Sequence, residues 1–165
     1  MIVGLMADTH DRLPFIEKAV KRLNKEKVEM VLHAGDYIAP FAVQRLNTLK
    51  ARLIGVLGNN DAEQQLLKNG FVDMGAELRG KFAEIMIDGL KTAILHGEET
   101  ELLRSLISVD CYQILVHGHT HQAKTYREGE TLVINPGEVC GYLTGKSTIA
   151  TVDTRTQEVT IIQLR

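Results

Sequence analysis

The sequence has no long apolar stretch and no large excess of charge of one sign. Its formal net charge is −2, so no overall positive field favours nucleic acid or an anionic membrane surface. The apolar run at the N-terminus turns polar at Asp8 and is too short for a signal peptide or a membrane span. We therefore expect a cytoplasmic protein with no membrane contact and no stable complex with nucleic acid.

Cysteine is also scarce, and no segment has the composition of a linker. Cys111 and Cys140 lie far apart and outside any CxxC pattern, so we expect two reduced thiols rather than a disulfide. The hydrophobic content of 44% and the charged content of 24% exclude a disordered chain. The length of 165 residues predicts a single domain that covers residues 1–165.

One layout recurs in the first half of the sequence: a short apolar run ends abruptly in polar residues. The runs 2–7, 30–33 and 53–57 are followed by Asp8, Asp36 and Asn59, and each reads as a buried strand. Helices are expected at 14–26, from Pro40 onward and at 62–68, with prolines near the start of the first two. This alternation of strands and helices predicts a parallel sheet.

The second half is richer in strands. Strands are expected at 82–87, 91–95, 113–116, 123–127, 131–134, 148–152 and 159–164, with a helix at 100–108. Asp88-Gly89 is a strong turn signal between the first two of these strands. The predicted fold class is α/β, with two sheets packed face to face as a β-sandwich flanked by helices.

Histidine, aspartate and asparagine follow five of the predicted strands, at the sheet edge where ligands commonly bind. Imidazole nitrogen and carboxylate oxygen suit Zn²⁺, Mn²⁺, Fe and Ni²⁺, and these clusters contain no thiolate. The spacing of two in Asp8-Thr9-His10 points both side chains to one face of an extended segment, and His119 and His121 share that spacing. These residues predict a metal site. His33 and His117 lie within or at the ends of apolar runs, so structural roles are expected for them.

Five motifs occur in an order that resembles the calcineurin-like metallophosphoesterase superfamily. They are Asp8-x-His10, Gly35-Asp36, Gly58-Asn59-x-Asp61, His96-Gly97 and Gly118-His119-x-His121. Asn135-Pro136-Gly137 resembles a downstream loop of the small single-domain phosphodiesterase branch of this superfamily. The resemblance implies a four-layer αββα metallophosphoesterase fold, which agrees with the order of elements above.

The resemblance also implies a ligand set for two divalent metal ions per chain. One ion would be held by Asp8, His10, Asp36 and His121, and the other by Asp36, Asn59, His96 and His119. Mn²⁺ is the expected metal, with Ni²⁺, Zn²⁺ and Fe as alternatives. A hydroxide that bridges the two ions would attack phosphorus in line, and the substrate would be a small phosphate ester or a nucleotide.

The sequence departs from the family pattern at three places. Many relatives carry a histidine at the position of Asn60, where it serves as a general acid to the leaving group. The family's acidic residue is missing after Gly35-Asp36, and Glu98 stands where close relatives often have histidine. Asn60 is retained as a catalytic and substrate-binding candidate, and Asp61 beside it as a catalytic candidate that could orient a group at position 60.

The charge of the site loops favours a diester substrate. Arg12 is the only cation assigned to these loops, beside Glu98 and Glu138, and a dianionic monoester would need more positive charge. The alternative from a different class is a weakly catalytic or non-catalytic metal-binding scaffold for protein interactions, like the small retromer subunit. A metal-dependent hydrolase of a substrate without phosphorus is a third reading. Whether the chain forms a homo-oligomer is left open.

Overall fold

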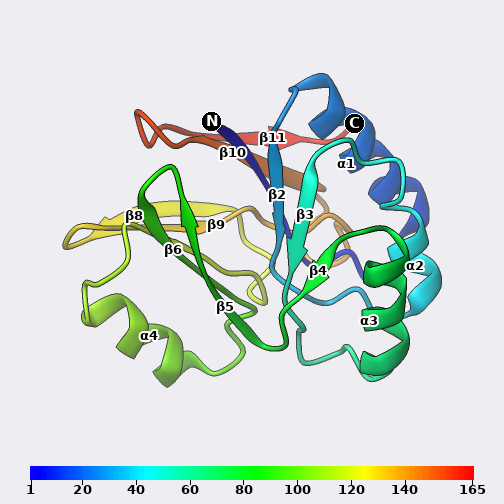
Figure 1. Cartoon of the computed structure of the whole chain (residues 1–165), viewed down its shortest axis with the longest axis horizontal. Helices are drawn as coiled ribbons and strands as arrows, with labels where there is room; N and C mark the ends of the chain where they lie inside the picture. The colour runs from blue at the N-terminus through cyan, green and yellow to red at the C-terminus, as the bar shows by residue number, and fades with distance from the viewer.

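The computed structural model describes residues 1–165, and its first half alternates strands and helices as predicted (Figure 1). The elements are β1 (Ile2–Met6), α1 (Leu13–Lys25), β2 (Met30–His33), α2 (Pro40–Gln44), β3 (Arg52–Gly55), α3 (Gln64–Asp73) and β4 (Glu77–Leu78). These four strands are parallel neighbours, and the antiparallel pair β10 (Thr148–Asp153) and β11 (Val159–Gln163) extends the sheet in the order β11-β10-β1-β2-β3-β4.

The second half forms a five-stranded sheet. Its elements are β5 (Phe82–Ile87), β6 (Leu90–Leu95), α4 (Thr100–Ser108), β7 (Ile114–Val116), β8 (Lys124–Glu128) and β9 (Thr131–Asn135). The strand order is β5-β6-β7-β9-β8, with parallel pairing at the centre and an antiparallel pair at each edge. Asp88 and Gly89 make the expected hairpin turn between β5 and β6.

Three apolar layers hold these elements together. Alternate residues of the strands, such as Val3, Leu5 and Ile94, meet between the two sheets and form a closed core. α1 to α3 cover the outer face of the six-stranded sheet, and α4 covers the outer face of the other sheet (Figure 1). The predicted α/β sandwich flanked by helices is confirmed. None of the four helices is long and apolar enough to cross a bilayer.

Two elements differ from the sequence-based prediction. The helix expected at 62–68 runs instead from Gln64 to Asp73. It passes through Gly70 at a cost of about 1 kcal/mol, because Leu67 and Phe71, one turn apart, are both fully buried against the six-stranded sheet. The strand β4 was not predicted, because two residues are too few to show any alternation of apolar and polar side chains.

Candidate metal centre

The predicted metal ligands lie together where strands of both sheets end. Asp8 and His10 follow β1, Asp36 follows β2 and Asn59 follows β3, all in the six-stranded sheet. His96 follows β6, and His119 and His121 follow β7, in the five-stranded sheet. The two sheets therefore contribute ligands from opposite sides of one site. Asp8 Oδ2 connects them directly, because it accepts a hydrogen bond of 3.1 Å from the backbone N–H of His119.

Two carboxylate oxygens occupy the centre of this cluster. Asp36 Oδ2 is 3.3 Å from His10 Nε2 and 3.3 Å from His96 Nε2. Asp8 Oδ1 is 3.8 Å from His10 Nε2, 3.9 Å from His96 Nε2 and 3.6 Å from His121 Nε2. Asp36 thus stands between histidines that come from different sheets, as a ligand shared by two cations would.

Three atoms at this centre are buried and have no hydrogen-bond partner: Asp8 Oδ1, His10 Nε2 and His96 Nε2. A buried polar atom without a partner costs about 1–3 kcal/mol, so three at one point need a compensating group. Carboxylate oxygen and imidazole nitrogen are donors for divalent transition metals, and the ligand atoms of Asp8, His10 and Asp36 all lie within 4.8 Å of one another. The residues present therefore fit a metal site.

The backbone of these loops differs from the expected extended conformation. Five ligands have a positive φ: Asp8 (51°), His10 (39°), Asp36 (62°), His119 (67°) and His121 (61°). The side chains converge because the chain turns sharply at each ligand, and not because alternate residues of a strand share a face. The interpretation of the spacing of two was therefore wrong, although the residues it selected are adjacent in space. Left-handed backbone in non-glycine residues is uncommon and clusters at functional sites.

A glycine allows two of these loops to approach closely. A Cβ atom on Gly58 would overlap Asp36 Oδ1 and would lie 2.7 Å from the backbone nitrogen of Asp36. Only a residue without a side chain fits at this point, so the loop after β3 can pass directly beneath the central carboxylate.

Contacts outside the centre fix the direction of the imidazole rings. His96 Nδ1 donates to the carbonyl oxygen of Ala34 at 2.8 Å, and His121 Nδ1 donates to Glu138 Oε2 at 2.7 Å. Both contacts leave Nε2 free to face the centre, as second partners of metal-binding histidines do. His119 Nδ1 donates to Asn59 Oδ1 at 3.1 Å, which pairs two of the predicted ligands of the second ion.

Glu138 is a buried carboxylate that contacts the predicted ligand His121, and the sequence analysis assigned it no role. It is fully buried, and six donor groups surround its carboxylate. The donors are His121 Nδ1, Cys140 Sγ, the backbone N–H groups of Tyr142, Leu143 and Thr144, and the hydroxyl of Thr144. Burial raises the pKa of Glu138, but the bonds from His121 and Thr144 outweigh it and lower the pKa to about 2. Its place directly after Asn135-Pro136-Gly137 was the available signal.

Asn60 and Asp61 lie beside Asp36 but differ in what they contact. Asn60 is exposed, and its amide and backbone nitrogens donate to the two oxygens of Asp36 at 2.7 and 3.0 Å. Asp61 is buried and accepts the backbone N–H groups of Asp36, Tyr37, Ile38 and Gly58 at 2.7–2.9 Å. Its oxygens are therefore occupied by the backbone, so Asp61 positions the loops after β2 and β3.

The surroundings of Cys140 and Arg12 also differ from those that the sequence predicted. Cys140 is buried, and its sulfur lies within 4.8 Å of the ligand nitrogens of His10 and His121, so a thiol does adjoin the metal cluster. Burial and the neighbouring Glu138 raise the pKa of this thiol to about 12, which keeps it protonated as a donor. The Arg12 guanidinium donates to the carbonyl oxygen of Cys140 and lies 4.0 Å from the centre of the Phe15 ring. Neither cysteine forms a disulfide.

The two histidines expected to be structural have such contacts. His33 is fully buried, accepts the backbone N–H of Gly35 and stacks on Tyr37 with ring centres 4.0 Å apart. Burial and the nearby His96 lower the pKa of His33 to about 3, so it stays neutral. His117 Nδ1 donates to the carbonyl oxygen of Gly118 at 3.1 Å. Neither residue forms a hydrogen bond or an ion pair with the carboxylates of Asp8 and Asp36.

The electrostatics of the centre favour a cation. Burial alone would lower the pKa of His10, but the carboxylates of Asp36 and Asp8 outweigh burial and raise it to about 9. The same balance raises the pKa of His96, and the two histidines hold the pKa of Asp36 well below its usual range. Protonated histidine here provides the positive charge that a metal ion would otherwise supply.

Known proteins resemble the chain over nearly its whole length. The family model of the calcineurin-like phosphoesterase superfamily domain matches residues 1–157. A phosphodiesterase of Methanocaldococcus jannaschii is 42% identical over 159 residues, which are 96% of both chains. A probable metallophosphoesterase of Methanothermobacter thermautotrophicus is 32% identical over 145 residues, 83% of this chain and 76% of the relative.

Solved structures give the same result. The structure of an archaeal phosphodiesterase matches with a TM-score of 0.95 and 41% identity, over 99% of this chain and 100% of the other. Vps29 from Chaetomium thermophilum matches with a TM-score of 0.74 over 99% and 95% of the two chains; at 16% identity, this likeness shows the fold alone. The motifs, the fold and these relatives agree, and the chain belongs to the calcineurin-like phosphoesterase superfamily.

Proposed function

We propose that this phosphoesterase is a phosphodiesterase that uses two divalent cations, with Asp36 as their shared ligand. The observation that carries the proposal is the convergence of three buried polar atoms without partners, on Asp8, His10 and His96, around one carboxylate. An interaction scaffold without metal would have no need to retain these atoms unpaired. The phosphodiesterases at 42% and 41% identity support the reaction class.

We assign four ligands to each ion, and Asp36 is shared by both. Asp8, His10, Asp36 and His121 would hold one ion, and Asp36, Asn59, His96 and His119 would hold the other. Bound cations would polarise the phosphoryl oxygen and make a water nucleophilic near neutral pH. With nitrogen and oxygen donors and a protonated thiol, the set suits Mn²⁺, with Ni²⁺, Zn²⁺ and Fe as alternatives.

The chain's own residues preorganise this site. Asn60 holds both oxygens of Asp36, while Glu138 and the carbonyl oxygen of Ala34 aim His121 and His96 at the centre. We assign Asp61 a positioning role, because its carboxylate supports the backbone of Asp36 and Gly58. The amide of Asn60 has no titratable proton near neutral pH, so protonation of the leaving group would fall to water or to another group.

The surroundings favour a phosphate that carries one charge and two substituents. The Arg12 guanidinium donates to the carbonyl oxygen of Cys140 and forms no hydrogen bond with a predicted metal ligand. A cavity of about 280 Å³ opens beside His121 and offers room for one ester substituent, with Lys146 as the only cation in its lining. A singly charged diester needs less positive charge than a dianionic monoester, and we propose a diester on this basis.

The proposal is tested by reconstituting metal-free protein with Mn²⁺, Ni²⁺ or Zn²⁺. Elemental analysis should approach two ions per chain, and kcat/KM should be higher for bis(p-nitrophenyl) phosphate than for p-nitrophenyl phosphate. Asp36→Asn should lower both metal content and activity, while Asp73→Asn, on the exposed end of α3, should change neither. A content of zero or one ion with every metal would refute the dinuclear site. Two bound ions without turnover would favour the scaffold.

A further inference from the structure

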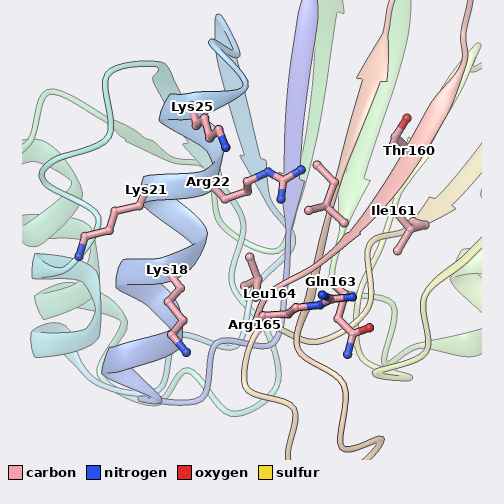
Figure 2. Close-up of a pocket in the computed structure, with 10 residues that line it drawn as sticks. Lys18, Lys21, Arg22, Lys25, Thr160, Ile161, Gln163, Leu164 and Arg165 are labelled. Atoms are coloured by element: carbon pink, nitrogen blue, oxygen red, sulfur yellow. The ribbon is translucent and has the colours of Figure 1, made fainter.

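A groove with a volume of about 660 Å³ runs between α1 and the edge strand β11 (Figure 2). None of the predicted metal ligands lines it. Figure 2 shows the Arg22 guanidinium reaching from α1 toward the strand, whereas Lys21 points away from it. One wall of the groove is thus a helix and the other is the last strand of the six-stranded sheet.

The charged side chains that line this groove have one sign. Five of its ten lining residues are lysine or arginine, and none is acidic. Lys18, Arg22 and Lys25 lie four and three residues apart, so they share one side of α1. Only Arg22 has a carboxylate partner, Glu26 at 2.6 Å, while Lys18 and Lys25 have none within 4.0 Å. The groove therefore presents positive charge that the chain itself leaves mostly uncompensated.

The strand wall offers unpaired backbone groups. In an antiparallel pair, alternate residues of each strand form hydrogen bonds with the partner strand. The backbone N–H of Leu164 donates to the carbonyl oxygen of Ser147, so the even-numbered residues of β11 are the ones that bond to β10. Ile161 and Gln163 consequently direct their backbone N–H and C=O groups outward, and the side chain of Ile161 is 38% exposed. None of the five residues of β11 is charged, whereas the edge strand β8 carries Lys124, Arg127 and Glu128. Charges on an edge strand commonly prevent pairing with another chain, and β11 lacks them.

We propose that this groove binds an extended acidic peptide segment of another protein, which adds to β11 as a further strand. The backbone of the segment would pair with Ile161 and Gln163, and carboxylates on one side of it would face the cations of α1. The proposal does not depend on the function proposed for the metal centre.

Two other occupants fit the groove less well. A second copy of this chain, paired strand to strand through β11, would bring two sets of uncompensated cations together, which is unfavourable. A nucleic acid would meet the cations but would leave the backbone groups of Ile161 and Gln163 without partners, and the chain as a whole has a net charge of −2. A strand with acidic side chains satisfies both walls at once.

The test uses the full chain and a fluorescent synthetic peptide in which glutamate alternates with valine. Matched peptides carry lysine in place of glutamate, or proline in place of the central valine, and binding is followed by fluorescence anisotropy. Lys18→Glu combined with Lys25→Glu should weaken binding of the acidic peptide by about tenfold or more, since two attractive contacts become repulsive. Lys68→Glu, an exposed charge reversal on α3, is the matched control and should leave affinity unchanged.

Two further readouts separate strand addition from simple charge attraction. Amide hydrogen exchange at Ile161 and Gln163 should slow when the acidic peptide is bound, and Ile161→Pro should abolish binding without removing a bond to β10. Equal binding of the acidic and lysine peptides would overturn the proposal. So would unchanged exchange at both amides, or a single-stranded oligonucleotide that binds at least as tightly as the acidic peptide and competes with it.

Discussion

Replacement of Glu138 by glutamine should damage both the metal centre and the stability of the fold. All six groups around this carboxylate are donors, so either orientation of the glutamine amide turns its NH₂ group toward a donor. If NH₂ replaces Oε1, the backbone N–H of Thr144 loses its acceptor; if it replaces Oε2, His121 Nδ1 and the backbone N–H of Tyr142 lose theirs. The substitution is nearly isosteric, but no orientation satisfies its surroundings.

The magnitude follows from these lost bonds. Hydrogen bonds to a charged group contribute about 1.5–3 kcal/mol each, and the exposed side of Thr144 lets water compensate in part, so we expect a loss of about 2–3 kcal/mol. For a chain of this size, that loss lowers Tm by about 4–12 °C. His121 Nδ1 loses its acceptor in one orientation and keeps only a neutral amide oxygen, a weaker acceptor than a carboxylate, in the other, so metal binding should weaken by up to about 10–100-fold.

Two assays measure these effects separately. Urea unfolding of the metal-free protein gives the free energy of unfolding, and competition with a metal-binding dye gives the affinity for Mn²⁺. Glu130→Gln is the matched control, because the exposed side chain of Glu130, in the turn between β8 and β9, forms no hydrogen bond or ion pair. If Glu138→Gln stays within about 0.5 kcal/mol of the parent and binds metal equally well, the six-donor argument is wrong.

Three further predictions concern the residues around Asp36. The pKa of metal-free His10 is raised to about 9, so a metal ion must displace the proton of this histidine. Mn²⁺ affinity should therefore fall by about tenfold for each pH unit below that value. A titration series in which affinity does not change with pH would contradict this prediction. In metal-free protein, His119→Gly should be more stable than His119→Ala by about 1 kcal/mol in urea unfolding, since φ is 67° there; equal stabilities would argue against backbone strain. Asn60→His should raise kcat/KM selectively for alkyl leaving groups, by up to about 10²–10⁴-fold, because histidine can protonate the leaving oxygen. A shallow dependence of kcat/KM on leaving-group pKa in the parent protein would mean that another residue already donates this proton.

The sequence predicted what depends on local pattern and on the order of motifs. The apolar runs located β1, β2 and β3 to within a few residues, and the polar residues after them identified which loops meet. The positive φ of Asp8, His10 and His121 could not be read from a spacing of two, which an extended strand also satisfies. Nearby residues do not determine such a turn; contacts from distant loops hold it.

Long-range contacts also explain the other differences. Cys140 is 130 residues from His10 along the chain, so no local rule placed its sulfur beside the histidines. Asp61 was selected as a catalytic candidate, because its sequence position suggested that it would orient residue 60. Its carboxylate instead binds backbone groups 3 and 23–25 residues away, which only the folded chain brings together.

The origin of the predicted metal ligands from two different sheets has a consequence for how the two layers are held. The interface between the sheets is apolar, and apolar contacts are non-directional, so they tolerate small sliding of one layer over the other. Coordination bonds tolerate displacements of only about 0.2 Å, so bound metal would select one alignment of the layers. At a metal concentration about a thousand times Kd, binding would add about 4 kcal/mol to the free energy of unfolding. Core substitutions that shift this alignment, such as Val116→Ala, would then weaken metal binding without altering a single ligand.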